Sequence, residues 1–211
     1  MVGFALRRIS PPRLNVGVAR SFFGLPNLPE LPNPLRQFGE TSPKEHSEKK
    51  ILGYSQKQLY DVVSNIDDYR LFVPWCTDSM ILSTRNLNSS GNRQILHAEL
   101  GIGFGALKER YVSEVTCEKY NMVMAVSKDT SLFRQLATVW RFTPNIPAAS
   151  TNVTDPANFR SCQLQFHILF EFANSFYTQV STLFHDQVSK SMVQAFEDRC
   201  REVYGPPSQI L

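Results

Sequence analysis

Apolar and polar residues alternate most regularly between residues 162 and 172 of the chain. The apolar positions are Leu164, Phe166, Ile168, Phe170 and Phe172, and polar side chains occupy most of the positions between them. Because successive side chains of a strand point to opposite faces, this pattern predicts a strand with one apolar and one solvated face. Less regular alternation predicts further strands at residues 49–54, 79–87, 93–100, 107–118, 122–127 and 132–142.

The last apolar pattern has the spacing of a helix and extends from about residue 175 to residue 204. Its stripe consists of Phe176, Val180, Leu183, Phe184, Val188, Met192, Phe196, Cys200 and Val203. A helix of about 30 residues spans roughly 45 Å, and the following Gly205 and Pro206 predict its end. A shorter helix is predicted after Ser55, because Ser55 and Gln58 match a capping box.

A long helix with one apolar stripe requires a surface to pack on, and the apolar face of the predicted sheet provides one. We therefore expect an α+β domain in which a curved antiparallel sheet wraps around the long C-terminal helix. The space between the sheet and the helix is a candidate site for an apolar ligand.

The first 29 residues differ in composition from the rest of the chain, with four arginines and no aspartate, glutamate or lysine. Such a basic, acid-poor leader is typical of a mitochondrial transit peptide, and Arg20 before Phe22 resembles a matrix-processing site. A disordered basic tail is the alternative. Four prolines between residues 25 and 34 predict an extended linker. We place the transit peptide and linker at residues 1–47, the domain at 48–205 and a short tail at 206–211.

Charge and cysteine content exclude several classes of protein. The formal net charge is +3, without the clustered basic residues that nucleic-acid binding requires. No run of 18 or more apolar residues occurs, so no membrane-spanning helix is expected. The four cysteines lie far apart and lack the spacing of a zinc site. We therefore expect reduced, mostly buried thiols and no metal.

No set of residues has the spacing of a catalytic site. His97, His167 and His185 have no matching acid or nucleophile, and no serine lies in a nucleophile elbow. The glycine-rich run at residues 101–105 resembles a phosphate loop only superficially, because it lacks the lysine and does not open a helix. It predicts a bulged strand turn or a flexible apolar loop. We therefore assign no catalytic residue.

Several segments of the domain resemble the StAR-related lipid-transfer (START) superfamily, and within it the polyketide-cyclase-like branch. They are YSQKQLYDVV at residues 54–63, FVPWC at 72–76, KERYVSEV at 108–115, WRF at 140–142, MVQAFE at 192–197 and REVYG at 201–205. The resemblance covers about residues 48–205 and implies the helix-grip fold of this superfamily. With its basic leader, the chain is similar to the mitochondrial coenzyme Q-binding proteins of this branch.

This resemblance implies non-enzymatic binding of ubiquinone, with ubiquinone as the bound ligand and no further cofactor. It also implies a lipid chaperone or carrier, attached peripherally to the matrix side of the mitochondrial inner membrane. Such a protein would support respiratory electron transport and coenzyme Q biosynthesis, with the respiratory complexes or biosynthetic enzymes as partners.

Two alternatives remain open. One is a cyclase/aromatase-like enzyme, for which Tyr111 and Ser113 are the only candidate polar groups. The other is a protein-interaction module, as in ribosome-associated bacterial relatives.

Ubiquinone has an isoprenoid tail and a weakly polar ring, so its site is expected to be wide and apolar with few hydrogen-bond donors. The candidate lining residues are Leu100, Trp140, Phe142, Phe166, Ile168, Phe170, Phe184, Val188 and Met192. Trp140 is the principal candidate because it has the largest side chain on a predicted concave strand. Ordinary core packing is the alternative for each of these residues.

A gate or membrane contact has its own candidates, which are Phe72, Val73, Trp75, Ile102 and Phe104. Packing of the connection between helix and strand is the alternative for residues 72–75. Lys108 and Arg110 are candidates for contact with anionic phospholipid or a quinone carbonyl. Ion pairs with Glu109 or Glu114 are the alternative for these two cations.

Overall fold

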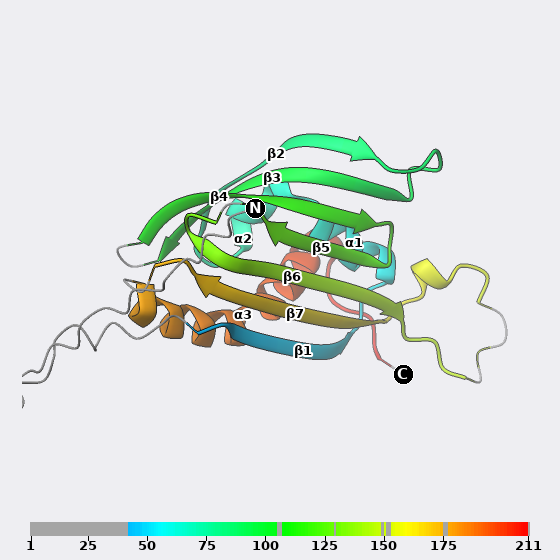
Figure 1. Cartoon of the computed structure of the whole chain (residues 1–211). Coiled ribbons are helices and arrows are strands. Elements are labelled where there is room, and N and C mark those ends of the chain that lie inside the picture. The colour runs from blue at the N-terminus through cyan, green and yellow to red at the C-terminus, as the bar shows by residue number, and fades with distance from the viewer. Residues whose placement is uncertain are drawn as a thin grey trace, which may run out of the picture. The chain divides into compact units, whose positions relative to one another are not determined.

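The alternating segments of the sequence form the strands of one curved sheet in the computed structural model of the protein (Figure 1). The structure describes residues 42–104, 107–128, 130–148, 150, 153–174 and 177–210, so most of the predicted leader and linker lies outside the described residues. The strands are β1 (Lys44–Leu52), β2 (Cys76–Asn86), β3 (Arg93–Phe104), β4 (Leu107–Glu118), β5 (Met122–Ser127), β6 (Phe133–Pro144) and β7 (Cys162–Phe172). The helices are α1 (Gln56–Ser64), α2 (Tyr69–Phe72) and α3 (Thr178–Tyr204), with 3-10 turns η2 (Ile66–Asp68) and η3 (Pro156–Asn158).

The sheet is antiparallel throughout, with the strand order β1-β7-β6-β5-β4-β3-β2. Strands β2 to β7 follow one another along the chain, whereas β1 pairs with β7, from Lys44 opposite Phe170 to Leu52 opposite Cys162. β1 therefore begins earlier than the expected residue 49. Its first residues are polar or charged, and pairing with an interior strand outweighs their weak strand propensity.

Helix α3 lies along one face of the sheet, which confirms the predicted helix-grip architecture (Figure 1). It packs on β1, β7, α1 and α2. Phe184, Val188 and Phe196 of the predicted stripe are buried. Leu183 was expected on the same stripe but is 57% exposed, because its position one residue before Phe184 turns it about 100° around the helix axis. Val203, in the last turn, is also exposed.

Helix α1 begins where the capping box predicts. The Ser55 hydroxyl accepts a hydrogen bond from the Gln58 backbone N–H at 3.2 Å, and the Gln58 side chain accepts one from the Ser55 N–H at 2.8 Å. These two bonds satisfy backbone donors that a helix start otherwise leaves unpaired. Leu59 and Val63 are then buried on the side of the helix that faces the core.

The glycine-rich run belongs to β3 and is not a flexible loop, at least through Phe104, where the described part ends. A Cβ atom on Gly101 or Gly103 would lie 2.8 Å from the Thr77 side chain. Glycine at these positions therefore allows β2 to approach β3 closely beside the bulge between Cys76 and Asp78. The sequence pattern showed the glycines but not the distant residue that requires them.

The residues after α3 pack back onto the domain. The Ser208 N–H donates to the Gly53 carbonyl at 2.7 Å, and a Cβ on Gly53 would lie 2.1 Å from the Ser208 carbonyl oxygen. Gly205 ends the helix with a positive φ of 85° and donates its N–H to the Arg201 carbonyl. The described part of the predicted tail at residues 206–211 is thus held against the junction between β1 and α1.

Candidate ligand-binding cavity

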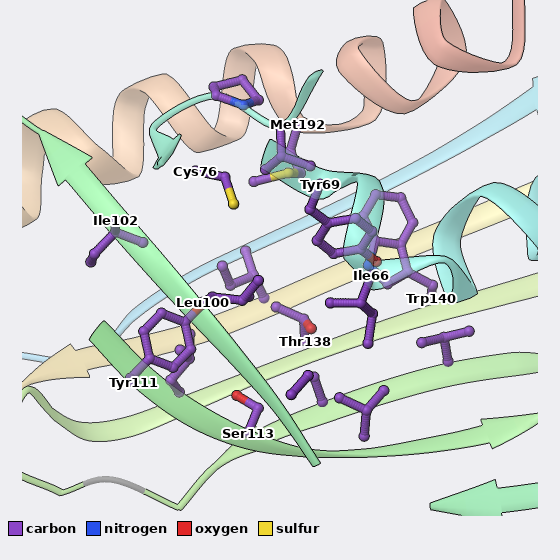
Figure 2. A pocket seen from close by; sticks show the side chains of 18 of the residues that line it. Ile66, Tyr69, Cys76, Leu100, Ile102, Tyr111, Ser113, Thr138, Trp140 and Met192 are labelled. Carbon is purple, nitrogen blue, oxygen red and sulfur yellow. The ribbon is translucent and has the colours of Figure 1, made fainter. Parts of the chain in front are cut away.

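A cavity of about 110 Å³ lies between the concave face of the sheet and the helices (Figure 2). Its lining comprises Ile66, Tyr69, Val73, Pro74 and Cys76 from the α2 region, Ala98, Leu100 and Ile102 from β3, Tyr111, Ser113 and Val115 from β4, Val123 and Ala125 from β5, Phe133, Leu136, Thr138 and Trp140 from β6, Phe166 and Ile168 from β7, and Phe184, Met192 and Phe196 from α3. Within each strand the lining residues are spaced by two or more positions, as expected for side chains on one face of a sheet.

The cavity exists because several inward positions carry short side chains. Ala98, Ser113, Ala125 and Thr138 occupy neighbouring strands of the concave face. Longer side chains at the same positions would fill the space in front of the sheet, as they do elsewhere in the core. The lining is therefore a curved apolar wall with room in front of its central strands.

Six of the predicted lining residues do line the cavity: Leu100, Trp140, Phe166, Ile168, Phe184 and Met192. Trp140 lies at the centre of an aromatic group, with its ring centroid 4.3 Å from that of Phe166 and 4.5 Å from that of Phe196. It is only 4% exposed, so it serves the core and the cavity wall together. Contact of these residues with a ligand stays a prediction.

Phe142, Phe170 and Val188 lie in the core, away from the cavity lining. Phe142 is nearer the α1 end of β6, where its ring packs edge-on against Tyr60 at 6.1 Å. Phe170 lies beyond Ile168 on β7 and packs against Phe184 at 5.1 Å. Alternation along a strand selects the inward face correctly but cannot separate the part of that face that borders a cavity from the part that is filled.

The gate candidates divide in the same way. Val73 and Ile102 line the cavity, whereas Phe72 packs on Phe196 at 5.0 Å between ring centroids. Trp75 has a positive φ of 61°, which is unusual for a bulky residue. Its carbonyl accepts a hydrogen bond from the Gly103 N–H at 2.9 Å, and its ring lies 5.9 Å from that of Phe184. The side chain of Phe104 lies outside the described residues.

The polar groups of the lining are hydroxyls and one thiol. The Tyr69 hydroxyl donates to the Val63 carbonyl, and the Cys76 thiol donates to the Asp78 carbonyl at 3.2 Å. Burial raises the pKa of the Tyr111 hydroxyl and raises the pKa of the Cys76 thiol to about 11, so both groups are neutral at physiological pH. The lining carries no charged side chain among the described residues, and it therefore offers hydrogen bonds but no ionised acid or base.

The charged candidates Lys108 and Arg110 are not part of the cavity lining. Arg110 forms ion pairs with Asp78 at 2.7 Å and Glu99 at 2.6 Å, and not with Glu109 or Glu114 as the sequence suggested. His97 lies 3.8 Å from Glu114, and His167 lies 3.6 Å from Glu45, so these histidines do have acidic neighbours in space. Neither histidine belongs to the cavity lining. Within the part of the chain that the structure describes, no group of histidine, cysteine, aspartate and glutamate is arranged to hold a metal ion.

Sequence reasoning named Leu100 and Ile102 of β3 but missed Ala98 beside them, and it also missed Val115 of β4 and Val123 and Ala125 of β5. The alternation of Ala98, Leu100 and Ile102, and of Val123 and Ala125, was available as a signal. It indicates which side chains point inward, but the curvature that gathers these strands around one cavity comes from the whole sheet. None of the described helices combines the length and the apolar character needed to cross a bilayer.

Comparison with known proteins agrees with the fold. The model of the family described as polyketide cyclase / dehydrase and lipid transport matches residues 52–197. A START superfamily protein from Mycobacterium smegmatis superposes with a TM-score of 0.53 at 15% identity, over 75% of this chain and 98% of that chain, which supports the fold alone.

Two curated relatives are more similar in sequence. Coenzyme Q-binding protein COQ10 homolog B, mitochondrial, from Xenopus laevis is 38% identical over 76% of this chain and 59% of its own length. Coenzyme Q-binding protein COQ10, mitochondrial, from Dictyostelium discoideum is 31% identical over 74% of this chain and 68% of its own length. The chain thus spans about three fifths of the frog protein and slightly more than two thirds of the amoebal one. It belongs to the polyketide cyclase / dehydrase and lipid transport family and, within that family, to the mitochondrial coenzyme Q-binding proteins.

Proposed function

We propose that this protein binds ubiquinone in the cavity between its sheet and α3, and carries it without transforming it. The observation that supports this proposal is an apolar cavity with neutral hydroxyls in a chain whose relatives are named coenzyme Q-binding proteins. A wide apolar wall suits an isoprenoid tail, because burial of apolar surface contributes roughly 25 cal/mol per Å². The uncharged lining suits a quinone ring, which has no charge to pair.

Binding of a ubiquinone requires the cavity to widen. Its volume of about 110 Å³ is below the roughly 300–1,000 Å³ of pockets that enclose small ligands. Met192 is an adaptable lining residue, because its unbranched side chain changes rotamer easily. The gate candidates Val73 and Ile102 border the same space, and movement of these side chains is the simplest way to admit the ring and its first isoprene units.

The proposal extends to location and partners. We infer that the protein is attached peripherally to the matrix side of the mitochondrial inner membrane. There it supports respiratory electron transport and coenzyme Q biosynthesis, and it interacts with the proteins of those pathways. The names of the relatives and the basic, acid-free composition of residues 1–29 support mitochondrial targeting.

N-terminal sequencing of the cellular protein should find a start between about residues 21 and 50, and an intact Met1 would contradict the targeting. Alkaline carbonate should release the protein from mitochondrial membranes, whereas retention in the pellet would contradict a peripheral attachment.

The central experiment is identification of the lipid that copurifies with the protein from mitochondria. Mass spectrometry of the extracted lipid should find ubiquinone enriched over its abundance in the membrane. A parallel preparation of a mitochondrial protein of similar size without a lipid cavity controls for carry-over. Enrichment of a different lipid class, or no lipid above that control, would contradict the proposal.

A further inference from the structure

Two hydroxyl groups lie on the concave wall of the cavity among apolar side chains. Ser113 comes from β4 and Thr138 from β6, and both are on the inward faces of their strands (Figure 2). Their neighbours on those faces are Tyr111 and Val115 on β4, and Leu136 and Trp140 on β6. Valine or alanine would continue the apolar wall at either position, so the two hydroxyls are exceptions to the surface around them.

Neither of these hydroxyls has a hydrogen-bond partner among the described residues. Ser113 is only 3% exposed, and it borders the cavity. Thr138 is half-buried, and both hydroxyls border the cavity, so each keeps its hydrogen-bonding capacity for a group that enters that space. Two other polar groups of the lining are already engaged, since Tyr69 donates to the Val63 carbonyl and the Cys76 thiol to the Asp78 carbonyl. The Tyr111 hydroxyl lies on the next inward position of β4 and is a third hydroxyl of the lining. The unpaired hydroxyls therefore point to a polar atom of a ligand.

We propose that Ser113 and Thr138 bind the ring oxygens of the head group, while the prenyl tail lies along the apolar remainder of the lining. This assignment rests on the proposed function. A quinone carbonyl only accepts hydrogen bonds, whereas a quinol hydroxyl both donates and accepts them. A serine or threonine hydroxyl can rotate to donate or to accept, so the same pair suits both forms. A lysine or arginine at these positions would only donate, and the described lining contains neither. The site thus holds the oxidised and the reduced ligand alike.

The test uses Ser113→Ala, Thr138→Val and the double variant of the full chain. Thr143→Val is the matched control, because Thr143 lies on β6 with an exposed side chain and is not part of the lining. The probes are a short-chain ubiquinone, its quinol, and a prenyl hydrocarbon that lacks the ring. Each single variant should weaken binding of quinone and quinol about three- to tenfold, the effect of one neutral hydrogen bond. Binding of the hydrocarbon should be unchanged, and so should all binding by Thr143→Val.

Thermal stability separates a ligand-binding role from a structural one. Removal of a hydroxyl that bonds to nothing within the fold should leave the melting temperature of the unliganded protein unchanged or raise it. A lowered melting temperature would overturn the assignment, because it would mean that the hydroxyls bond within the fold. Unchanged quinone affinity in the double variant would also overturn it, as would a loss confined to one redox form. Failure of the wild-type protein to bind any quinone would instead overturn the proposed function itself.

Discussion

β7 and the pair β4 and β5 contribute inward faces to the same interior, but they fill it differently. The inward residues of β7 are large, and Phe166, Phe170 and Phe172 are at most 2% exposed. The inward positions of β4 and β5 include Ser113 and Ala125, which border the cavity. Both strand groups follow the same two-residue period. The period thus determines which face is buried. Large inward residues such as Phe166 also border the cavity, but the space itself lies in front of the short side chains of the central strands.

Truncation in the filled region should have the largest effect. Phe170 is fully buried and packs on Phe172 and Phe184 at 5.9 and 5.1 Å between ring centroids. Phe170→Ala should lower the free energy of unfolding by about 3–5 kcal/mol, measured by urea denaturation. Leu183→Ala is the control, since its 57% exposed side chain should cost less than about 0.5 kcal/mol. Similar losses in both variants would contradict the filled core around β7.

Trp140 belongs to both regions, so its truncation should affect stability and binding together. It lines the cavity and also contacts Phe166 and Phe196. Trp140→Ala should cost about 3 kcal/mol of stability and remove more quinone than the unfolded fraction explains. Melting temperature and copurified quinone should be measured on one sample. Quinone loss in proportion to unfolding would leave Trp140 as core alone, and unchanged quinone would move the site toward residues 72–75.

The difference between the packed region around β7 and the cavity in front of β4 and β5 also explains which features the sequence could predict. Alternation located β4, β5 and β7 with their observed bounds, because a strand that is buried on one face must alternate. The start of β1 was not predictable in this way, since Lys44 and Glu45 are held in the sheet by pairing with β7 and not by their own propensity. The role of Gly101 likewise depends on Thr77, a residue in another strand.

The cavity was predictable only in part, for a related reason. The pattern identified Trp140 and Phe166 as inward residues, and both line the cavity. It could not distinguish them from Phe170, because a large inward side chain is buried in either region. Small inward residues such as Ala125 mark the cavity better, but a single small residue on a strand is equally compatible with close packing of another element.

Filling the cavity should have a smaller effect on stability, and of opposite sign. Ala125→Leu places additional carbons in the space in front of β5, and it should raise the free energy of unfolding by about 0.5–2 kcal/mol. Binding of a short-chain ubiquinone should fall at least about tenfold, because the added side chain occupies the ligand's volume. Ala137→Leu, on the opposite face of β6, is the matched control. A destabilisation of about 1–3 kcal/mol by Ala125→Leu would show that the space is already filled.

The smallest expected effect is a difference in thiol reactivity between the two regions. Cys76 is half-buried and lines the cavity, whereas Cys162 and Cys200 are fully buried in the packed core. Burial raises the pKa of Cys76 to about 11 and that of Cys162 and Cys200 to about 12. The reactive thiolate is therefore scarce near neutral pH, and its fraction rises about tenfold per pH unit below the pKa.

A small uncharged maleimide should accordingly label Cys76 first in the native protein, slowly at pH 7.5 and faster at pH 8.5, as followed by mass spectrometry of peptides. Cys162 and Cys200 should react only after unfolding, because neither borders the cavity. A saturating short-chain ubiquinone should slow the labelling of Cys76, since ligand and reagent compete for the same space. Equal labelling of Cys76 and Cys162 would contradict the distinction between the two regions. Labelling of Cys76 that quinone does not slow would place the ligand away from the α2 side of the cavity.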